Sequence, residues 1–228
     1  MTDQFPFEKA FEMLAVNLVA DQAKISPIAS TEKHFLNAIT KYPNNKKLCE
    51  LFAYRFVKYA ETLKVQGKAQ EGIDLLDRAR QMDELALHQS MIVPKLVSML
   101  NNLGLQLLQA KKYSQARVVI ERGLDLDPDS KSLNNNWDVV MLQWAQLAYD
   151  KGQFKESIQI LVDGRKRSKR DKRTFTQLIE AYYNETALRL LDADKIEASV
   201  TRFEEGLKLL PNSETLKQNL DFAKSEQE

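Results

Sequence analysis

The sequence predicts an all-α protein, a right-handed α-solenoid of five helix pairs with a C-terminal capping helix over 213–228. A pattern of small and apolar residues recurs five times along the 228 residues, starting near residues 12, 53, 97, 138 and 180. The chain has only 7 Gly and 6 Pro and few β-branched runs, which leaves little material for sheets. A stack of five units accounts for the whole length, so we expect one domain over 1–228.

The clearest copy of the pattern lies between residues 97 and 128. Its features, in chain order, are Leu103-Gly104, Leu107, Tyr113, Ala116, Ile120, Gly123 and Pro128. This copy resembles the tetratricopeptide repeat, a pair of antiparallel helices in 34 residues. Gly104 and Ala116 would let the two helices approach closely, and Pro128 would end the second helix. The resemblance implies stacked helix pairs that bind a protein or peptide on a concave wall.

Four further copies follow the same frame when Val97 is counted as position one. Position eight is small in every copy but the first, which has the bulky Val19: Val19, Ala60, Gly104, Ala145 and Ala187. Position twenty reads Thr31, Gly72, Ala116, Ser157 and Ser199. Position twenty-four is large and apolar and position twenty-seven is small, as in Phe35 and Ala38, Leu76 and Ala79, Ile120 and Gly123, Leu161 and Gly164, Phe203 and Gly206.

The copies depart from the family in their spacing. Starts at 12, 53, 97, 138 and 180 lie 41 to 44 residues apart, against 34 in the family. The surplus falls between units, in KKLCELF, LALHQSMIVP, KSLNNNW and KRTFTQLI. Because seven residues are about two helical turns, an added segment keeps its apolar side chains on the same face. We therefore predict that 46–52, 131–137 and 172–179 extend first helices of about 20 residues.

Several local signals predict where helices begin and end. Gly67 and Gly152 follow first helices and are expected to end them. A second helix is predicted from about Lys68 to Met82, and another from about Phe154 to Arg167. Pro94 lies either in the first turn of a helix that starts near Ser90, where it costs no hydrogen bond, or at a kink in a longer helix, and we favour the first. Ser213 is expected to cap the last helix, whose apolar stripe is Leu216, Leu220 and Ala223.

Composition excludes several classes of function. The net charge is +1, so there is no global attraction to nucleic acid or membrane. The single cysteine, Cys49, rules out an internal disulfide and is expected to be an inert core residue. The N-terminus lacks the bases of a signal peptide, and no apolar run approaches the roughly 18 residues of a membrane span. We expect a cytoplasmic chain without an intrinsic membrane span.

Catalytic and cofactor motifs are missing from the sequence. No Gly-rich phosphate loop, G-x-S-x-G or H-E-x-x-H motif occurs. Neither His34 nor His88 has partners at metal-ligand spacing, and the carboxylates fall on helix faces or caps. The sequence therefore predicts a protein that is not an enzyme, with no cofactor and no metal site.

Binding is the function that the resemblance implies, with the first helix of each pair lining the concave wall. Position six is an amide in three of five copies, which could hydrogen-bond the main chain of an extended peptide. The expected groove residues are Asn17, Lys58, Asn101, Asn102, Leu105, Gln143, Gln146, Tyr149 and Glu185. Some family members grip the carboxylate tails of heat-shock chaperones with Lys and Arg at positions two, five and six. Here those positions hold Lys58 and no Arg, so that clamp is absent.

One cluster of charge interrupts this pattern. Residues 165–173, which we call the basic turn, hold seven bases and one acid: Arg165, Lys166, Arg167, Lys169, Arg170, Lys172 and Arg173. The basic turn is interpreted either as a solvated helix end or as a docking patch for an acidic protein, nucleic acid or anionic lipid. Without interleaved aromatic residues it is poor evidence for specific nucleic-acid binding. Self-association through the apolar concave wall is a further alternative.

Overall fold

The computed structural model describes residues 14, 33, 37, 38, 41, 42 and 45–226. These residues form helices and no strands, as the sequence predicts. Most of the helix pair that starts near residue 12, including Asn17 and His34, lies outside the described residues. Contacts divide the chain into two compact units, residues 1–103 with 125–127 and residues 104–124 with 128–228.

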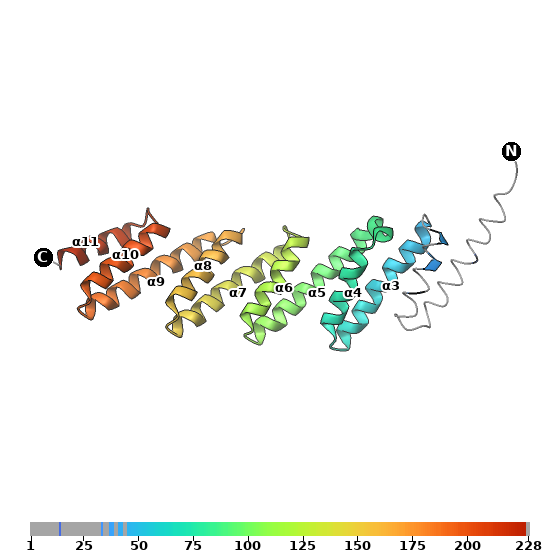
Figure 1. Ribbon diagram of the computed structural model, residues 1–228, viewed down its shortest axis with the longest axis horizontal. Helices are drawn as coiled ribbons and strands as arrows, with labels where there is room; N and C mark the ends of the chain where they lie inside the picture. Colours follow the sequence, from blue (N-terminus) through green and yellow to red (C-terminus); the bar gives the residue numbers. More distant parts are fainter. Residues whose placement is uncertain (1–13, 15–32, 34–36, 39–40, 43–44, 227–228) are drawn as a thin grey trace, which may run out of the picture. The chain divides into compact units, whose positions relative to one another are not determined.

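The first unit contains the helix pair α3 and α4, the 3-10 helix η1 and most of α5 (Figure 1). Their bounds are Lys46–Val65 for α3, Ala69–Arg80 for α4, Asp83–His88 for η1 and Gln89–Gln109 for α5. α3 packs against both α4 and η1. Its core includes Leu48, Phe52, Phe56 and Leu76, and Cys49 is buried as expected.

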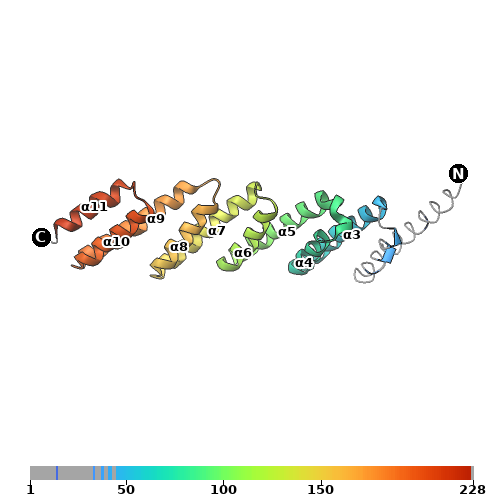
Figure 2. The same cartoon turned by 45° about the horizontal axis from the view of Figure 1, so that its top comes forward.

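The second unit contains the end of α5, most of α6 and the helices from α7 to α11. Their bounds are Tyr113–Leu126 for α6, Lys131–Asp150 for α7, Phe154–Arg167 for α8, Lys172–Asp192 for α9, Ile196–Leu209 for α10 and Glu214–Ser225 for α11. α7 pairs with α8 and α9 with α10, while α8 packs on α9 and α11 packs on both α9 and α10 (Figures 1 and 2). The described helices are thus consecutive, tetratricopeptide-like pairs with α11 as the terminal helix.

The three added segments are helical and continuous with the helices that follow. α3, α7 and α9 begin at Lys46, Lys131 and Lys172 and run for 20, 20 and 21 residues. Their added turns are anchored in the core by Phe52, Trp137, Phe175 and Ile179, each at most 2% exposed. The prediction of long first helices is confirmed, because the apolar residues of these turns keep the period of the helix.

The fourth surplus segment, 85–94, is divided between two elements. Its first part belongs to η1, and α5 begins at Gln89, one residue from the predicted start. Pro94 is the sixth residue of α5, so its expected place in the first turn is wrong. The missing N–H of Pro94 removes the bond that the carbonyl of Ser90 would otherwise accept. Burial of Ile92 and Leu96 on either side of Pro94 keeps the turn helical despite that loss.

The small positions of the repeat lie where the helices of a pair touch. The Ser157 hydroxyl donates to the Ala145 carbonyl at 2.7 Å, and the Ser199 hydroxyl donates to the Ala187 carbonyl at 2.8 Å. Positions eight and twenty therefore meet in both pairs. A Cβ on Gly104 would lie 2.6 Å from Ile120 Cγ1, so this glycine is required for close approach.

The turn inside each described pair repeats one geometry. A residue with positive φ ends the first helix, and the next N–H bonds to the carbonyl five residues earlier, as in a Schellman motif. Gly67 and Gly152 take this place at φ 79° and 73°, in agreement with the sequence prediction. Lys111 and Asp194 take it in the other two pairs, at φ 55° and 58°. The bonds run from Lys68 to Leu63, Lys112 to Leu107, Gln153 to Ala148 and Lys195 to Leu190.

The remaining boundaries follow the sequence closely. α4 is slightly shorter than predicted, and α8 has the predicted bounds. Ser213 caps α11 by accepting a hydrogen bond from the Leu216 N–H at 3.1 Å. The stripe of Leu216, Leu220 and Ala223 is buried.

Among the described helices, α5 is long and apolar enough to cross a membrane by length and composition alone. Its 18-residue window has a mean hydropathy of 1.2, a value that core helices of soluble proteins also reach. The sequence interpretation overlooked this helix because Ser, Asn and Gln interrupt its apolar run. These residues still leave the helix apolar on average. Ile92, Leu96, Met99 and Leu100 of this helix are buried inside the protein.

Candidate binding face on the first helices

α7 and α9 of the second unit carry matching exposed stripes. On α7 the stripe runs through Val139, Gln143 and Gln146, which are three or four residues apart and therefore share one helix face. On α9 every fourth residue is exposed: Gln177, Ala181, Glu185 and Arg189. We call these two stripes, with the groups that connect them to each other and to α11, the binding face.

Two hydrogen bonds and a ring stack join α7 to α9 across this face. The Tyr182 hydroxyl donates to Gln146 Oε1 at 2.7 Å, and the Tyr149 hydroxyl donates to Glu185 Oε2 at 2.8 Å. The rings of Tyr149 and Tyr182 stack with centroids 3.8 Å apart and planes at 14°. The face is therefore held in one arrangement before any ligand arrives.

The tyrosine hydroxyls of the binding face remain protonated donors at neutral pH. Burial, reinforced by the Glu185 carboxylate, raises the pKa of Tyr149 to about 12. Burial also raises the pKa of Tyr182, and the charges of Asp150 and Glu185 add to that effect. Both hydroxyls can therefore keep donating to Gln146 and Glu185 across the physiological range.

A further hydrogen bond continues the binding face from α9 to α11. Asn219 Nδ2 donates to Asn184 Oδ1 at 2.5 Å. Glu185 is also paired with Arg189, and Gln146 donates to Asp150 at 2.7 Å. These partners occupy both polar ends of Gln146 and both carboxylate oxygens of Glu185. Gln143 is exposed and makes no side-chain hydrogen bond within the described part of the chain.

The structure brings together three of the predicted groove residues, Gln146, Tyr149 and Glu185. It also adds Tyr182, which the sequence interpretation missed. The two hydrogen bonds between α7 and α9 join residues that are 36 positions apart in the sequence. The repeats that start at 138 and 180 are 42 positions apart, so residues at the same repeat position are not the ones that bond. One sequence signal could have indicated these contacts: Gln146 and Tyr149 are separated by the same number of residues as Tyr182 and Glu185.

Lys58, a predicted groove residue of the first unit, belongs to a cluster of charged side chains. Lys58 pairs with Glu61 at 3.1 Å, and Lys95 of α5 contacts the same carboxylate at 2.5 Å. These two bonds, the one from Lys95 first, lower the pKa of Glu61. Lys58 also lies 5.7 Å from the ring centroid of Tyr54, which is 51% exposed.

The predicted groove residues of α5, Asn101, Asn102 and Leu105, are all half-buried. Asn102 donates from Nδ2 to the Ser98 carbonyl at 2.8 Å within its own helix. Its side-chain oxygen still has the capacity to accept a bond from a ligand. Asn101 and Leu105 lie on the same helix, and Leu105 belongs to the second unit.

Three bases of the basic turn are used inside the second unit. Arg167 pairs with Glu121 at 3.3 Å and lies 5.6 Å from the ring of Trp137. Lys169 donates to the Pro128 carbonyl at 2.7 Å and pairs with Asp129 at 2.8 Å, and Arg170 donates to Asn135. The other four bases form no ion pair within the described part of the chain: Arg165, Lys166, Lys172 and Arg173.

A buried carboxyl lies beside the basic turn. Asp138 is 7% exposed, and its Oδ1 has no hydrogen-bond partner among the described groups. The Ser168 hydroxyl bonds to this carboxyl and accepts the Asp171 N–H at 3.0 Å. Burial raises the pKa of Asp138 above its ordinary value of 3.8; Asp171 adds to the shift, and Ser168 and Arg170 oppose it.

Asp138→Asn is expected to stabilise the fold at neutral pH. A carboxyl whose pKa is raised in the native state destabilises the fold progressively as pH rises from the unfolded value through the native one. The gain in the variant should be near zero at pH 3.8 and below, grow as pH rises through the native pKa, and then stay constant. Urea unfolding of both proteins between about pH 3.5 and 8 measures this difference. Asp221→Asn on exposed α11 is the control, and a wild type more stable than Asp138→Asn at pH 7 would contradict the assignment.

The described residues contain no group of three or more His, Cys, Asp or Glu side chains placed to hold a metal ion. His88 is the last residue of η1.

No protein-family profile matches the chain, and no curated protein matches it either. Among solved structures, the chain is similar to a tetratricopeptide repeat protein from Parabacteroides merdae, with 14% identity over 93% of this chain and 98% of the other, at a TM-score of 0.23. It is also similar to a chain of the APC/C hetero-tetramer Cut9-Hcn1, with 14% identity over 93% of this chain and 42% of the other, at a TM-score of 0.23.

Proposed function

We propose that this chain is a non-catalytic, cytoplasmic scaffold that binds a peptide or helix of a partner protein on the exposed faces of its first helices. The observation that supports this most is the binding face of the second unit. Hydrogen bonds from Tyr182, Tyr149 and Asn219 connect its side chains between α7, α9 and α11. A face ordered in advance loses less conformational entropy when a ligand binds.

The binding face offers both polar and apolar contacts. Gln143 can donate to and accept from a peptide main chain, because neither end of its amide is bonded to a described residue. Val139, one turn earlier, is 40% exposed and gives the neighbouring apolar contact. This combination suits an extended or helical segment whose backbone or apolar side chains meet the face.

Photo-crosslinking tests where a partner binds. A benzophenone amino acid is placed at Gln143 or Ala181 on the binding face, and at Val118 on α6 as an exposed control. Cross-links to a host protein are expected from the first two sites and not from the third. A partner that cross-links only from Val118 would place the contact on a second helix and contradict the proposal.

Gln143→Ala and Asn102→Ala are then expected to weaken binding of the recovered partner while leaving the fold intact. Losing one hydrogen bond and leaving its partner unpaired costs about 1–3 kcal/mol, or up to roughly a hundredfold in affinity. Charge reversal of Arg165 and Lys166, which avoids the structural Arg167, should matter less and mainly at low salt. Titration calorimetry at two salt concentrations makes the comparison. If charge reversal abolishes binding and neither amide variant changes it, the basic turn is the site.

The two alternative functions predict different outcomes in solution. Self-association through the same face requires a stable oligomer without ligand, which light scattering detects. Binding of nucleic acid or an anionic surface through Arg165, Lys166, Lys172 and Arg173 requires an affinity that falls steeply with salt.

A further inference from the structure

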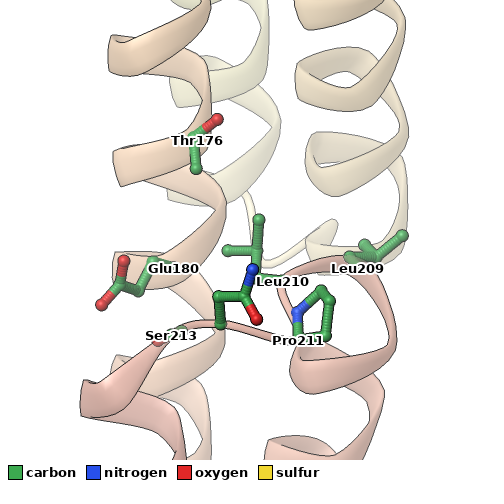
Figure 3. A pocket seen from close by; sticks show the side chains of 7 residues that line it. Thr176, Glu180, Leu209, Leu210, Pro211 and Ser213 are labelled. Carbon is green, nitrogen blue, oxygen red and sulfur yellow. The ribbon is translucent and has the colours of Figure 1, made fainter.

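A small pocket lies in the second unit between α9 and the turn that joins α10 to α11 (Figure 3). Its volume is about 270 Å³. α9 contributes two polar side chains one turn apart, and the end of α10 with the following turn contributes the rest. The lining residues are Thr176, Glu180, Leu209, Leu210, Pro211, Asn212 and Ser213.

The polar side of the pocket is rich in acceptors. The half-buried Glu180 carboxylate makes no ion pair or hydrogen bond within the described part of the chain. The Thr176 hydroxyl donates its hydrogen to the Lys172 carbonyl at 2.9 Å, which leaves its oxygen as an acceptor. The pocket wall holds both the C-terminal end of α10 at Leu209 and the N-cap of α11 at Ser213, whose opposite partial charges offset each other. The Glu180 carboxylate is therefore the group that favours a positively charged guest.

The other side of the pocket is apolar. Leu209, Leu210 and Pro211 line it. A guest that fits both sides has an aliphatic stem and a cationic end, as the long basic side chains do.

We propose that this pocket binds a lysine side chain of the partner protein. A single carboxylate with scattered hydroxyl and amide oxygens suits the three rotatable donors of an ammonium group better than the planar fork of a guanidinium. The pocket and the binding face share α9, since Glu180 precedes Asn184 by one turn and Asn184 is bonded to Asn219 of α11. The inference rests on the proposed function, because it names one side chain of the segment that the face binds.

Selection of peptides from a random displayed library against the whole chain tests the inference. The best peptides are synthesised with each lysine or, separately, with norleucine, its uncharged isostere. We expect one lysine whose replacement weakens binding about tenfold or more. Glu180→Gln should cause a similar loss, and the loss for the peptide and protein changes together should be smaller than their sum, because they remove one contact. Glu156→Gln changes an exposed carboxylate of α8; it is the matched control and should bind like the wild type.

Each other outcome overturns a defined part of the inference. Peptides that bind but are indifferent to both norleucine and Glu180→Gln contradict the lysine pocket and leave the scaffold function standing. A requirement for arginine instead of lysine contradicts the choice of guest. If no peptide is selected by a folded wild-type chain, the peptide-binding function fails, and the lysine pocket fails with it. Circular dichroism and thermal unfolding of each variant show that the fold is retained.

Discussion

Phe175→Ala is expected to remove about 3–5 kcal/mol from the free energy of unfolding. Phe175 is fully buried in the added turns of α9. Its ring packs against Gly164 of α8: a Cβ there would lie 2.8 Å from Phe175 Cζ and 3.0 Å from Met141 Cβ. The ring therefore fills the space that the missing side chain leaves, and its removal opens a cavity among three helices.

Guanidinium unfolding of Phe175→Ala measures the loss. Gln177→Ala, two residues further along the same helix and exposed, is the matched control and should change stability by less than about 0.5 kcal/mol. A loss for Phe175→Ala as small as that of the control would mean that the added turns of α9 are not part of the core.

The long first helices could be predicted because their signal is local and periodic. Seven added residues are close to two turns, so residues such as Phe52 and Trp137 fall on the face that the following helix already buries. The same reasoning placed the small positions of the repeat, and the contact between Ser157 and Ala145 confirms it. Helical periodicity and side-chain size can both be determined from the sequence alone.

The turns were only partly predictable. Gly67 and Gly152 announce a left-handed residue because glycine adopts positive φ without steric cost. Lys111 and Asp194 take the same conformation with no such signal, since the packing of their helix pairs requires the turn to close there. Pro94 shows a related effect. Its missing N–H favours a helix that begins closer to Pro94, but burial of Ile92 and Leu96 stabilises a helix that begins at Gln89.

The binding face was the least predictable part of the molecule. Repeat position identified Gln146, Tyr149 and Glu185 as residues on the wall, and the structure places them together. It could not show that Tyr149 bonds to Glu185, because the register between α7 and α9 depends on how whole side chains pack. The basic turn has the same limit, since composition cannot separate Arg167, bonded to Glu121, from Lys166, which forms no ion pair with any described residue.

Trp137→Ala is the second substitution with a large expected effect, again about 3–5 kcal/mol. The indole is 2% exposed, and its Nε1–H donates to the Gly164 carbonyl at 3.2 Å. The guanidinium of Arg167 lies over the ring. Trp137→Phe keeps an aromatic ring but loses the donor. Because the Gly164 carbonyl also accepts the Ser168 N–H at 2.9 Å, that variant should lose only on the order of 1 kcal/mol.

Urea unfolding of both Trp137 variants tests the order of these effects, with Val139→Ala on the exposed face of α7 as the control. Equal losses for Trp137→Phe and Trp137→Ala would mean that the hydrogen bond, and not the filled volume, carries the stability. Trp137 and Phe175 meet the same residue, Gly164, from α7 and α9. The double alanine variant should therefore lose less than the sum of the single losses, since the first substitution already loosens the packing that the second removes. Additive losses would show that the two added segments stabilise the second unit independently.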